Sequence, residues 1–341
     1  MESGWIQKLS HGKKKEPVLS AIARLIRLPN LIIIALTQYL MRYMIVAPFL
    51  GINNFELQLD DFHFALLVLA TCLIAAAGYA INDYFDTRTD RLNKPDRVVI
   101  DKEISRQMAI NLHTILNILG VGLGIYLSFY IKIPGLSVLF ILTAGLLWFY
   151  STNYKRQFLV GNLIVSLMVG TVPVLVVLFE IPLLNREYGE IMLKANANFN
   201  YIFYWVSGFG FFAFYTNFIR EIIKDAEDFE GDSAYGMNTF PIVLGIRTTR
   251  MLIIALLFIL IALVAIVLYR YILLSGENFD RITAAYFLFT VFIPLLIIIF
   301  YIIIAKSKRD YHISSQILKV VMLAGVLYSV IVYFTLNFRL N

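Results

Sequence analysis

The amino-acid sequence predicts an all-α polytopic membrane protein with nine transmembrane helices, and three observations support this prediction. Charged residues make up only 15% of the 341 residues, whereas soluble domains carry about 25%. The mean hydropathy is +0.76. Nine apolar runs each approach the roughly 20 residues that a helix needs to cross a bilayer. Together they leave no room for a separate soluble domain.

The nine runs follow one another along the chain with polar connections between them. Their approximate limits are 31–50, 63–82, 109–130, 134–151, 160–181, 200–219, 251–272, 283–304 and 318–337. We expect residues 1–30 to form an N-terminal segment, followed by one helical domain over residues 31–341. Residues 183–199 are expected to form an outer loop without a chemical motif. The single cysteine, Cys72, lies in the second run and is expected to be a small buried residue.

The distribution of basic residues predicts the orientation in the membrane. If the N-terminus is cytoplasmic, all but seven of the 29 Lys and Arg residues lie in segments on that side. Arg42 lies inside the first run, where we expect it to pair with Glu56 or to reach the outer interface. The other six are on the opposite side: Lys132, Arg186, Lys194, Arg270, Arg281 and Arg339. This positive-inside bias explains the basic composition without a nucleic-acid partner and predicts an integral protein of the cell membrane.

Two aspartate motifs of identical spacing follow the second and sixth runs, both on the predicted cytoplasmic side. The first reads NDYFDTRTD and the second DAEDFEGD. Residues at i, i+3 and i+7 share a narrow helix face, so each triplet lines one face if its helix continues beyond the membrane. A single such triplet usually marks a solvated face, but two matched ones on one side indicate a site. The carboxylates are Asp83, Asp86, Asp90, Asp225, Asp228 and Asp232.

The two acidic faces predict a cation between them, since like charges on one helix face repel. Mg²⁺ fits because it takes oxygen ligands and commonly binds through one or two carboxylates plus substrate phosphates. Asp83 and Asp90 are about 10 Å apart along a helix axis, so more than one ion, or contacts through water, is expected.

Basic and polar residues accompany the motifs. A cradle for phosphate groups is one interpretation of the basic residues, and positive-inside bias alone is the other. The basic residues are Arg91, Lys94, Arg97, Lys155, Arg156, Arg220 and Lys224. Asn30 and Asn217 lie at membrane depth, where they line a cavity, cap a helix or link two helices. Carboxylates, Mg²⁺ and phosphate contacts beside an apolar bundle point to transfer of an isoprenoid from its diphosphate.

These motifs resemble those of the UbiA superfamily of intramembrane prenyltransferases, whose first motif is N-D-x-x-D-x-x-x-D. The resemblance covers nearly the whole chain, including the nine-helix count and Arg27-Leu28-Pro29-Asn30. Within the superfamily, the segment 220–232 and Tyr150-Ser151 followed by Lys155 look most like the digeranylgeranylglyceryl phosphate synthases. The segment Asn93–Arg97 is similar to that branch, but Val98–Lys102 departs from its usual P-x-P-S-G continuation and puts the acceptor in question.

The resemblance implies a nine-helix bundle around a central cavity, with cytoplasmic loops over the cavity and a lateral opening to membrane lipids. It implies that the six aspartates hold Mg²⁺ and diphosphate and that Asn82 supports the first motif. Arg91, Lys94, Arg97, Lys155 and Lys224 are the expected diphosphate-binding residues, and Asn30, Tyr150 and Asn217 the expected residues of the prenyl cavity.

The implied reaction transfers a geranylgeranyl group to the hydroxyl of geranylgeranylglyceryl phosphate and releases diphosphate. Two alternatives stay open at this point. One is a prenyltransferase with an aromatic acceptor, as in quinone biosynthesis. The other is an ion-coupled transporter, although such proteins tend to carry acidic residues near the bilayer midplane. The sequence does not indicate the oligomeric state.

Overall fold

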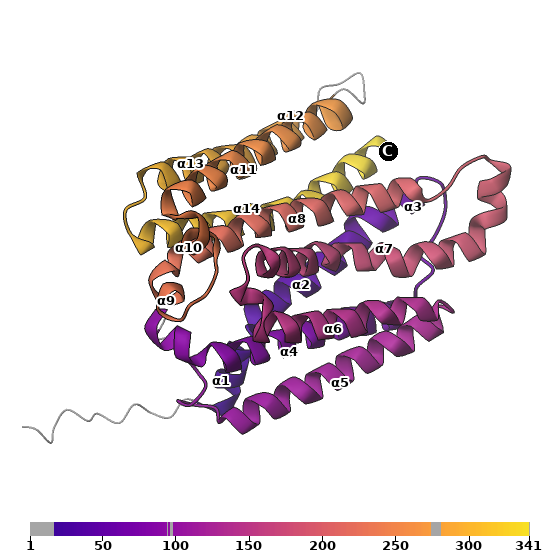
Figure 1. Cartoon of the computed structure of the whole chain (residues 1–341). Helices are drawn as coiled ribbons and strands as arrows, with labels where there is room; N and C mark the ends of the chain where they lie inside the picture. Colours follow the sequence, from indigo (N-terminus) through magenta and orange to yellow (C-terminus); the bar gives the residue numbers. More distant parts are fainter. Residues whose placement is uncertain (1–16, 94, 96–97, 274–280, 341) are drawn as a thin grey trace, which may run out of the picture.

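The computed structural model describes residues 17–93, 95, 98–273 and 281–340, and these form a helical bundle (Figure 1). Nine helical segments of this described part are long and apolar enough to cross a membrane, as the sequence predicts. The α-helices are α1 (Val18–Leu25), α2 (Leu28–Leu40), α3 (Ala47–Gly51), α4 (Asp61–Asn93), α5 (Arg106–Tyr130), α6 (Ser137–Thr152), α7 (Val160–Lys194), α8 (Asn200–Glu227), α9 (Phe229–Ala234), α10 (Phe240–Leu244), α11 (Ile246–Val267), α12 (Arg281–Phe287), α13 (Ile293–Ile304) and α14 (Lys308–Leu340).

Several of these helices join into longer spans through short irregular turns. Helices α2 and α3 are continuous through a π-helical segment, Met41–Val46, and α12 joins α13 through another, Leu288–Phe292. The α6–α7 connection contains a 3₁₀ turn, Tyr154–Arg156. Helix α7 continues to Lys194, so the outer loop expected over 183–199 is wrong for most of its length.

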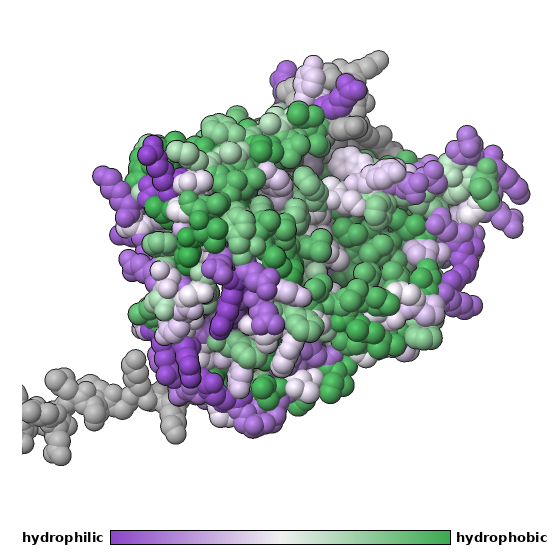
Figure 2. Space-filling model, viewed as in Figure 1, coloured by the Kyte–Doolittle hydropathy of each residue, from purple (hydrophilic) through white to green (hydrophobic). Residues whose placement is uncertain are grey.

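Helix α2 occupies the middle of the bundle, because it contacts α4, α7 and α14. Helix α4 packs mainly on α5 and α6, and α8 packs on α7 and α14. Helix α1 lies across the end of α4, where Ala21 and Leu25 share a buried cluster with Ala80 and Ile100. Figure 2 shows hydrophobic residues over the middle of the displayed face and hydrophilic residues gathered at its two ends. This distribution suits a protein that crosses a bilayer.

Helices α7 and α8 approach closely because glycines face each other across their contact. A Cβ atom on Gly210 would lie 2.7 Å from the carbonyl oxygen of Gly170 and 2.8 Å from a methyl carbon of Val174. Gly208, two residues earlier on α8, faces open space. Small residues commonly permit this kind of backbone approach between membrane helices.

Arg42 forms a buried ion pair at the end of the bundle away from the aspartate motifs. Its side chain is 2% exposed, and Nη1 lies 3.1 Å from Oε2 of Glu180 in α7, which is 1% exposed. Nη2 lies 3.1 Å from Oδ1 of Asp61 at the start of α4. The expected pairing with Glu56 or exposure at the interface is therefore wrong. The partner is a residue 138 positions away that burial brings close.

Replacing Gly210 with alanine is expected to destabilise the fold by about 1–3 kcal/mol, because the added methyl group overpacks against a backbone carbonyl. Gly208→Ala is the matched control and is expected to be neutral or slightly stabilising, since alanine favours helix. Denaturant unfolding in detergent, followed by circular dichroism, compares the two variants. Equal midpoints would contradict the close packing at Gly210.

Arg42→Met is expected to cost about 3–5 kcal/mol of stability, because it leaves the Glu180 carboxylate buried without its cation. The double variant Arg42→Met/Glu180→Gln removes both charges but keeps an oxygen that accepts from the backbone N–H of Leu59. We expect this double variant to recover at least half of the loss in the same unfolding assay. A double variant as unstable as the single one would show that lost packing, rather than the orphaned charge, dominates.

Candidate active site

The two aspartate motifs lie on segments that touch each other at one end of the bundle. The hydroxyl of Tyr235, just after α9, donates to the carbonyl of Arg88 in α4 at 3.2 Å. Gly231 in α9 lies so close to α4 that a Cβ atom there would overlap the side chain of Asn93. In Figure 1, α9 and α10 lie at the same end as the start of α14. The expected convergence of the motif segments is therefore confirmed.

The first motif lies on one continuous helix, as the spacing predicts. Helix α4 runs to Asn93, so Asp83, Asp86 and Asp90 share one face of it. The second motif departs from the prediction of a single helix. Helix α8 ends at Glu227, Asp228 adopts the bridge conformation (φ −95°, ψ 9°), and Asp232 belongs to the short helix α9.

The carboxylates of the first motif are held by Asn82 of the motif itself and by cations from two other parts of the chain. Nη2 of Arg27 donates to Oδ1 of Asp83 at 2.8 Å. Nδ2 of Asn82 donates to Oδ2 of Asp86 at 2.8 Å, and Nζ of Lys155 contacts Oδ1 of the same carboxylate. The expected support of the motif by Asn82 and the expected position of Lys155 both agree with these contacts.

The second motif is held in the same manner from different elements. Nδ2 of Asn162, near the start of α7, donates to Oδ2 of Asp225 at 2.9 Å. Nζ of Lys308, at the start of α14, lies 3.6 Å from Oδ1 of Asp228. Asp232 is 7% exposed and adds a further buried carboxylate near Asp225.

Arg27 is the central cation of the site. It adopts a left-handed backbone (φ 52°) immediately before α2, and its guanidinium lies 4.9 Å from the centre of the Tyr79 ring. Burial lowers the pKa of Arg27, but Asp83, Tyr79 and Asp90 together raise it by more, so the net pKa is well above its usual value. Arg27 is therefore a fixed positive charge between the motifs.

Tyr150 lies in the last turn of α6, five residues before Lys155, whose ammonium contacts Asp86. The other two residues expected in the prenyl cavity have protein partners. Asn30 accepts a hydrogen bond from Nζ of Lys319 at 3.0 Å. The buried Asn217 donates to Oγ of Ser166 at 3.3 Å, which links α8 to α7.

The remaining predicted basic residues either pair with acidic residues outside the two aspartate triplets or lie outside the described residues. Nη2 of Arg91 points to Asp101 of the α4–α5 connection, at 3.0 Å. Lys224 pairs with Glu221 one turn away, at 2.9 Å. Lys94 and Arg97 lie outside the residues that the structure describes.

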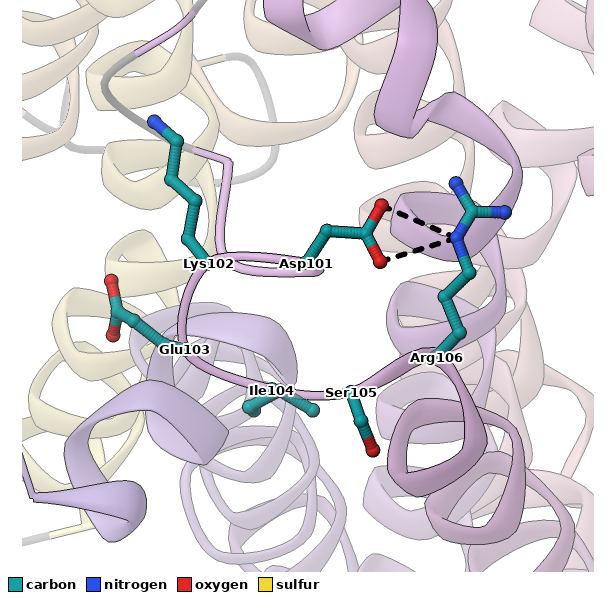
Figure 3. A pocket seen from close by; sticks show the side chains of 6 residues that line it. All are labelled: Asp101, Lys102, Glu103, Ile104, Ser105 and Arg106. Carbon is teal, nitrogen blue, oxygen red and sulfur yellow. Dashed lines mark hydrogen bonds and ion pairs between the residues drawn. The ribbon is translucent and has the colours of Figure 1, made fainter.

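A surface pocket of about 410 Å³ lies in the α4–α5 connection and is lined by residues 101–106 (Figure 3). In this view Asp101 faces Arg106, with 3.3 Å between its carboxylate and Nε of Arg106. None of the predicted aspartates lines this pocket. Its charged groups neutralise one another, so we assign the chemistry to the aspartate motifs and not to this pocket.

The donor chemistry of the motifs fits Mg²⁺, because all six carboxylates offer hard oxygen atoms. Over the described residues, however, no three acidic, His or Cys side chains surround a common point. The carboxylates instead face Lys, Arg and Asn groups. This arrangement suits an ion that binds through one or two carboxylates and takes its other ligands from water and substrate phosphates.

Arg27, Asn162 and Lys308 were not among the site residues predicted from the sequence. Arg27 could have been identified from the sequence, because it belongs to the Arg27–Asn30 segment that resembles the UbiA superfamily. No sequence pattern marks Asn162 or Lys308 as a site residue, since their contacts with Asp225 and Asp228 join segments 63 and 80 residues apart.

Fold and site together define a polytopic helical membrane protein with paired acidic motifs and their basic partners. The model of the UbiA prenyltransferase family matches residues 53–323. The chain belongs to the UbiA prenyltransferase family and is an integral membrane protein.

Curated relatives narrow the resemblance to one branch of this family. The chain is 35% identical over 193 residues to the digeranylgeranylglyceryl phosphate synthase of Methanothermobacter thermautotrophicus, covering 56% of this chain and 60% of that protein. It is 31% identical over 284 residues to the synthase of the same name from Methanobrevibacter smithii, covering 82% and 89%. The chain thus spans about 60% of the first of these relatives.

Solved structures share the fold. A structure from a study of digeranylgeranylglyceryl phosphate synthase in membranes matches with a TM-score of 0.58 and 22% identity, over 92% of this chain and 99% of that one. A UbiA homologue from Aeropyrum pernix matches with a TM-score of 0.57 and 16% identity, over 92% and 98%. A UbiA homologue from Archaeoglobus fulgidus, bound to GPP and Mg²⁺, matches with a TM-score of 0.52 and 16% identity, over 91% and 99%.

Proposed function

We propose that the chain transfers a geranylgeranyl group from its diphosphate to the hydroxyl of geranylgeranylglyceryl phosphate, with release of diphosphate. In this reaction the allylic C–O bond to diphosphate breaks, a new C–O ether bond forms, and the hydroxyl proton leaves. The convergence of two aspartate motifs with Arg27 and Lys155 carries the proposal, because it collects phosphate-binding and metal-binding groups at the end of an apolar bundle. The curated relatives that share the name digeranylgeranylglyceryl phosphate synthase support the choice of substrates.

Mg²⁺ is part of this proposal. Asp83, Asp86, Asp90, Asp225, Asp228 and Asp232 would hold it, and the Mg²⁺ in the Archaeoglobus fulgidus homologue supports that assignment. When bound, the metal neutralises charge that develops on the departing diphosphate.

The chain's own cations act on the same leaving group. Arg27 and Lys155 already donate to carboxylate oxygens, and phosphate oxygens offer equivalent charge-assisted hydrogen bonds. The ammonium of Lys224 and, outside the described residues, Lys94 and Arg97 complete the proposed diphosphate contacts. Arg91 points to Asp101 and is not needed for them.

We place this site on the cytoplasmic side of the cell membrane, with a cytoplasmic N-terminus, because the basic residues favour that orientation. The prenyl chain of the donor would extend from Tyr150 into the bundle. We treat residues 31–341 as one UbiA-like domain, on which the described helix of the 1–30 segment packs.

The alternatives make different demands on the chain. An aromatic acceptor would use the same carboxylates, so it is distinguished by product and not by the metal site. An ion-coupled transporter would need acidic groups open to a pathway near the midplane, whereas Glu180 lies at the end of the bundle away from the motifs and is paired with Arg42.

Product mass spectrometry tests the proposal directly. Purified protein is given Mg²⁺ and geranylgeranyl diphosphate, with geranylgeranylglyceryl phosphate in one tube and a dihydroxynaphthoate in another. We expect a doubly geranylgeranylated glycerol phosphate in the first tube only. A prenylated aromatic product would move the chain to quinone biosynthesis, and no release of diphosphate in either tube would contradict prenyl transfer.

Asp86→Asn and Asp228→Asn are each expected to lower turnover at least 100-fold, because each removes one charge from the proposed metal and diphosphate site. Both variants should keep the wild-type elution profile and thermal midpoint within a few degrees. Glu187→Gln, on the exposed end of α7, is the matched control and should retain full turnover. Near-normal turnover in either aspartate variant would contradict the assigned role.

A further inference from the structure

Helix α14 carries a polar stripe in an otherwise apolar sequence. Lys308, His312, Ser315 and Lys319 are spaced by four, three and four residues, so they fall within an arc of about 60° on one helix face. Helix α14 packs on α8 and contacts α2. The stripe therefore faces the middle of the bundle.

The first two residues of this stripe, at the start of α14, contact the second aspartate motif. Nζ of Lys308 lies 3.6 Å from Oδ1 of Asp228 and donates to the carbonyl of Asn93 at 2.8 Å. Nδ1 of His312 lies 3.0 Å from Oε1 of Glu227. Each of these two groups on α14 therefore has an acidic partner at the site already described.

Lys319, at the deep end of the stripe, has no such acidic partner. Its ammonium donates to the neutral Asn30 at 3.0 Å, and no carboxylate lies within ion-pair distance of it among the residues that the structure describes. The charged groups that act on it are the cations Arg220 and Arg27. A half-buried ammonium beside two like charges is costly unless an anion accompanies it.

The neighbouring cations do not have enough carboxylates either. Arg220 and Lys224 share the single carboxylate of Glu221, at 3.4 and 2.9 Å, while Arg27 is paired with Asp83. In the described part of the chain, Nε of Arg220 is buried without a hydrogen-bond partner. Of these cations, Arg220 and Lys224 share one carboxylate, and Lys319 has none within ion-pair distance among the described residues.

We propose that Lys319 and Arg220 bind a second phosphate group, the phosphate monoester of the acceptor lipid. This inference rests on the proposed function and adds to it the residues that select a phosphorylated acceptor. A phosphate monoester carries about −1.5 to −2 charges at pH 7. Such a group can accept hydrogen bonds from both Lys319 and Nε of Arg220, whereas an aromatic carboxylate brings only a single charge.

The depth of Lys319 separates this anion from the diphosphate of the donor. Lys308 contacts Asp228, and Lys319 lies eleven residues further along α14, about 16 Å in helix rise. A diphosphate held between Asp228 and Lys308 is too short to reach Lys319 as well. A second phosphate group would account for the other end of the stripe.

Lys319→Met tests the inference, because it removes the charge and keeps a side chain of similar length. In nanodiscs with saturating geranylgeranyl diphosphate, we expect the KM for geranylgeranylglyceryl phosphate to rise at least tenfold. The Kd for geranylgeranyl diphosphate should stay within twofold, and Lys319→Arg should restore most of the acceptor affinity. Lys132→Met, at the opposite end of the bundle, is the matched control and should change neither constant.

A second comparison uses geranylgeranylglycerol, which lacks the phosphate. Wild-type protein should prefer the phosphorylated lipid, and Lys319→Met should lose most of that preference. An unchanged KM, or an equal rise in the donor Kd, would overturn the inference. If wild-type protein binds the phosphorylated lipid through Lys319 but transfers nothing to it, the proposed function fails while the anion site stands.

Discussion

The site depends on one electrostatic constraint: six carboxylates lie at the end of an apolar bundle, where unpaired charge is costly. The structure meets this constraint with cations and amides from separate parts of the chain. Arg27 comes from the start of α2, Lys155 from the α6–α7 connection and Lys308 from the start of α14. The aspartates therefore link helix ends that lie far apart in the sequence.

The same pairs make the site suitable for an anionic substrate. Arg27 and Lys155 each donate a charge-assisted hydrogen bond to a carboxylate, and a phosphate oxygen is an equivalent acceptor. Arg27 and Lys155 can therefore exchange a carboxylate oxygen for a phosphate oxygen without leaving either cation unpaired. The charge pairs that stabilise this end of the bundle thus also supply the proposed phosphate contacts.

The sequence was sufficient where the relevant pattern was local. Helix α4 continues through Asp83, Asp86 and Asp90, so a spacing rule placed these residues correctly on one face. The second triplet has the same spacing, but its helix is interrupted at Asp228. Helix α9 then takes a different direction, in which Gly231 packs on Asn93. That break is set by a contact between distant segments, which a helical spacing rule does not contain.

Pairings between distant segments were the other part that the sequence could not supply. Arg42 has an acidic residue 14 positions away in Glu56, yet it pairs with Glu180, because packing of the Met41–Val46 segment on α7 decides which carboxylate it meets. In the sequence alone, Glu180 is recognisable only as an isolated charge at the end of an apolar run.

The basic residues of α14 show why topology and chemistry need not be competing explanations. Lys308 and Lys319 contribute to the positive-inside bias and are fully accounted for by it when only loops are counted. Once α14 is known to begin at Lys308, both fall on one face, together with His312 and Ser315. A lysine that favours one orientation in the membrane therefore lies on the same side as the acidic motifs. The predicted orientation and the proposed anion binding therefore draw on the same residues.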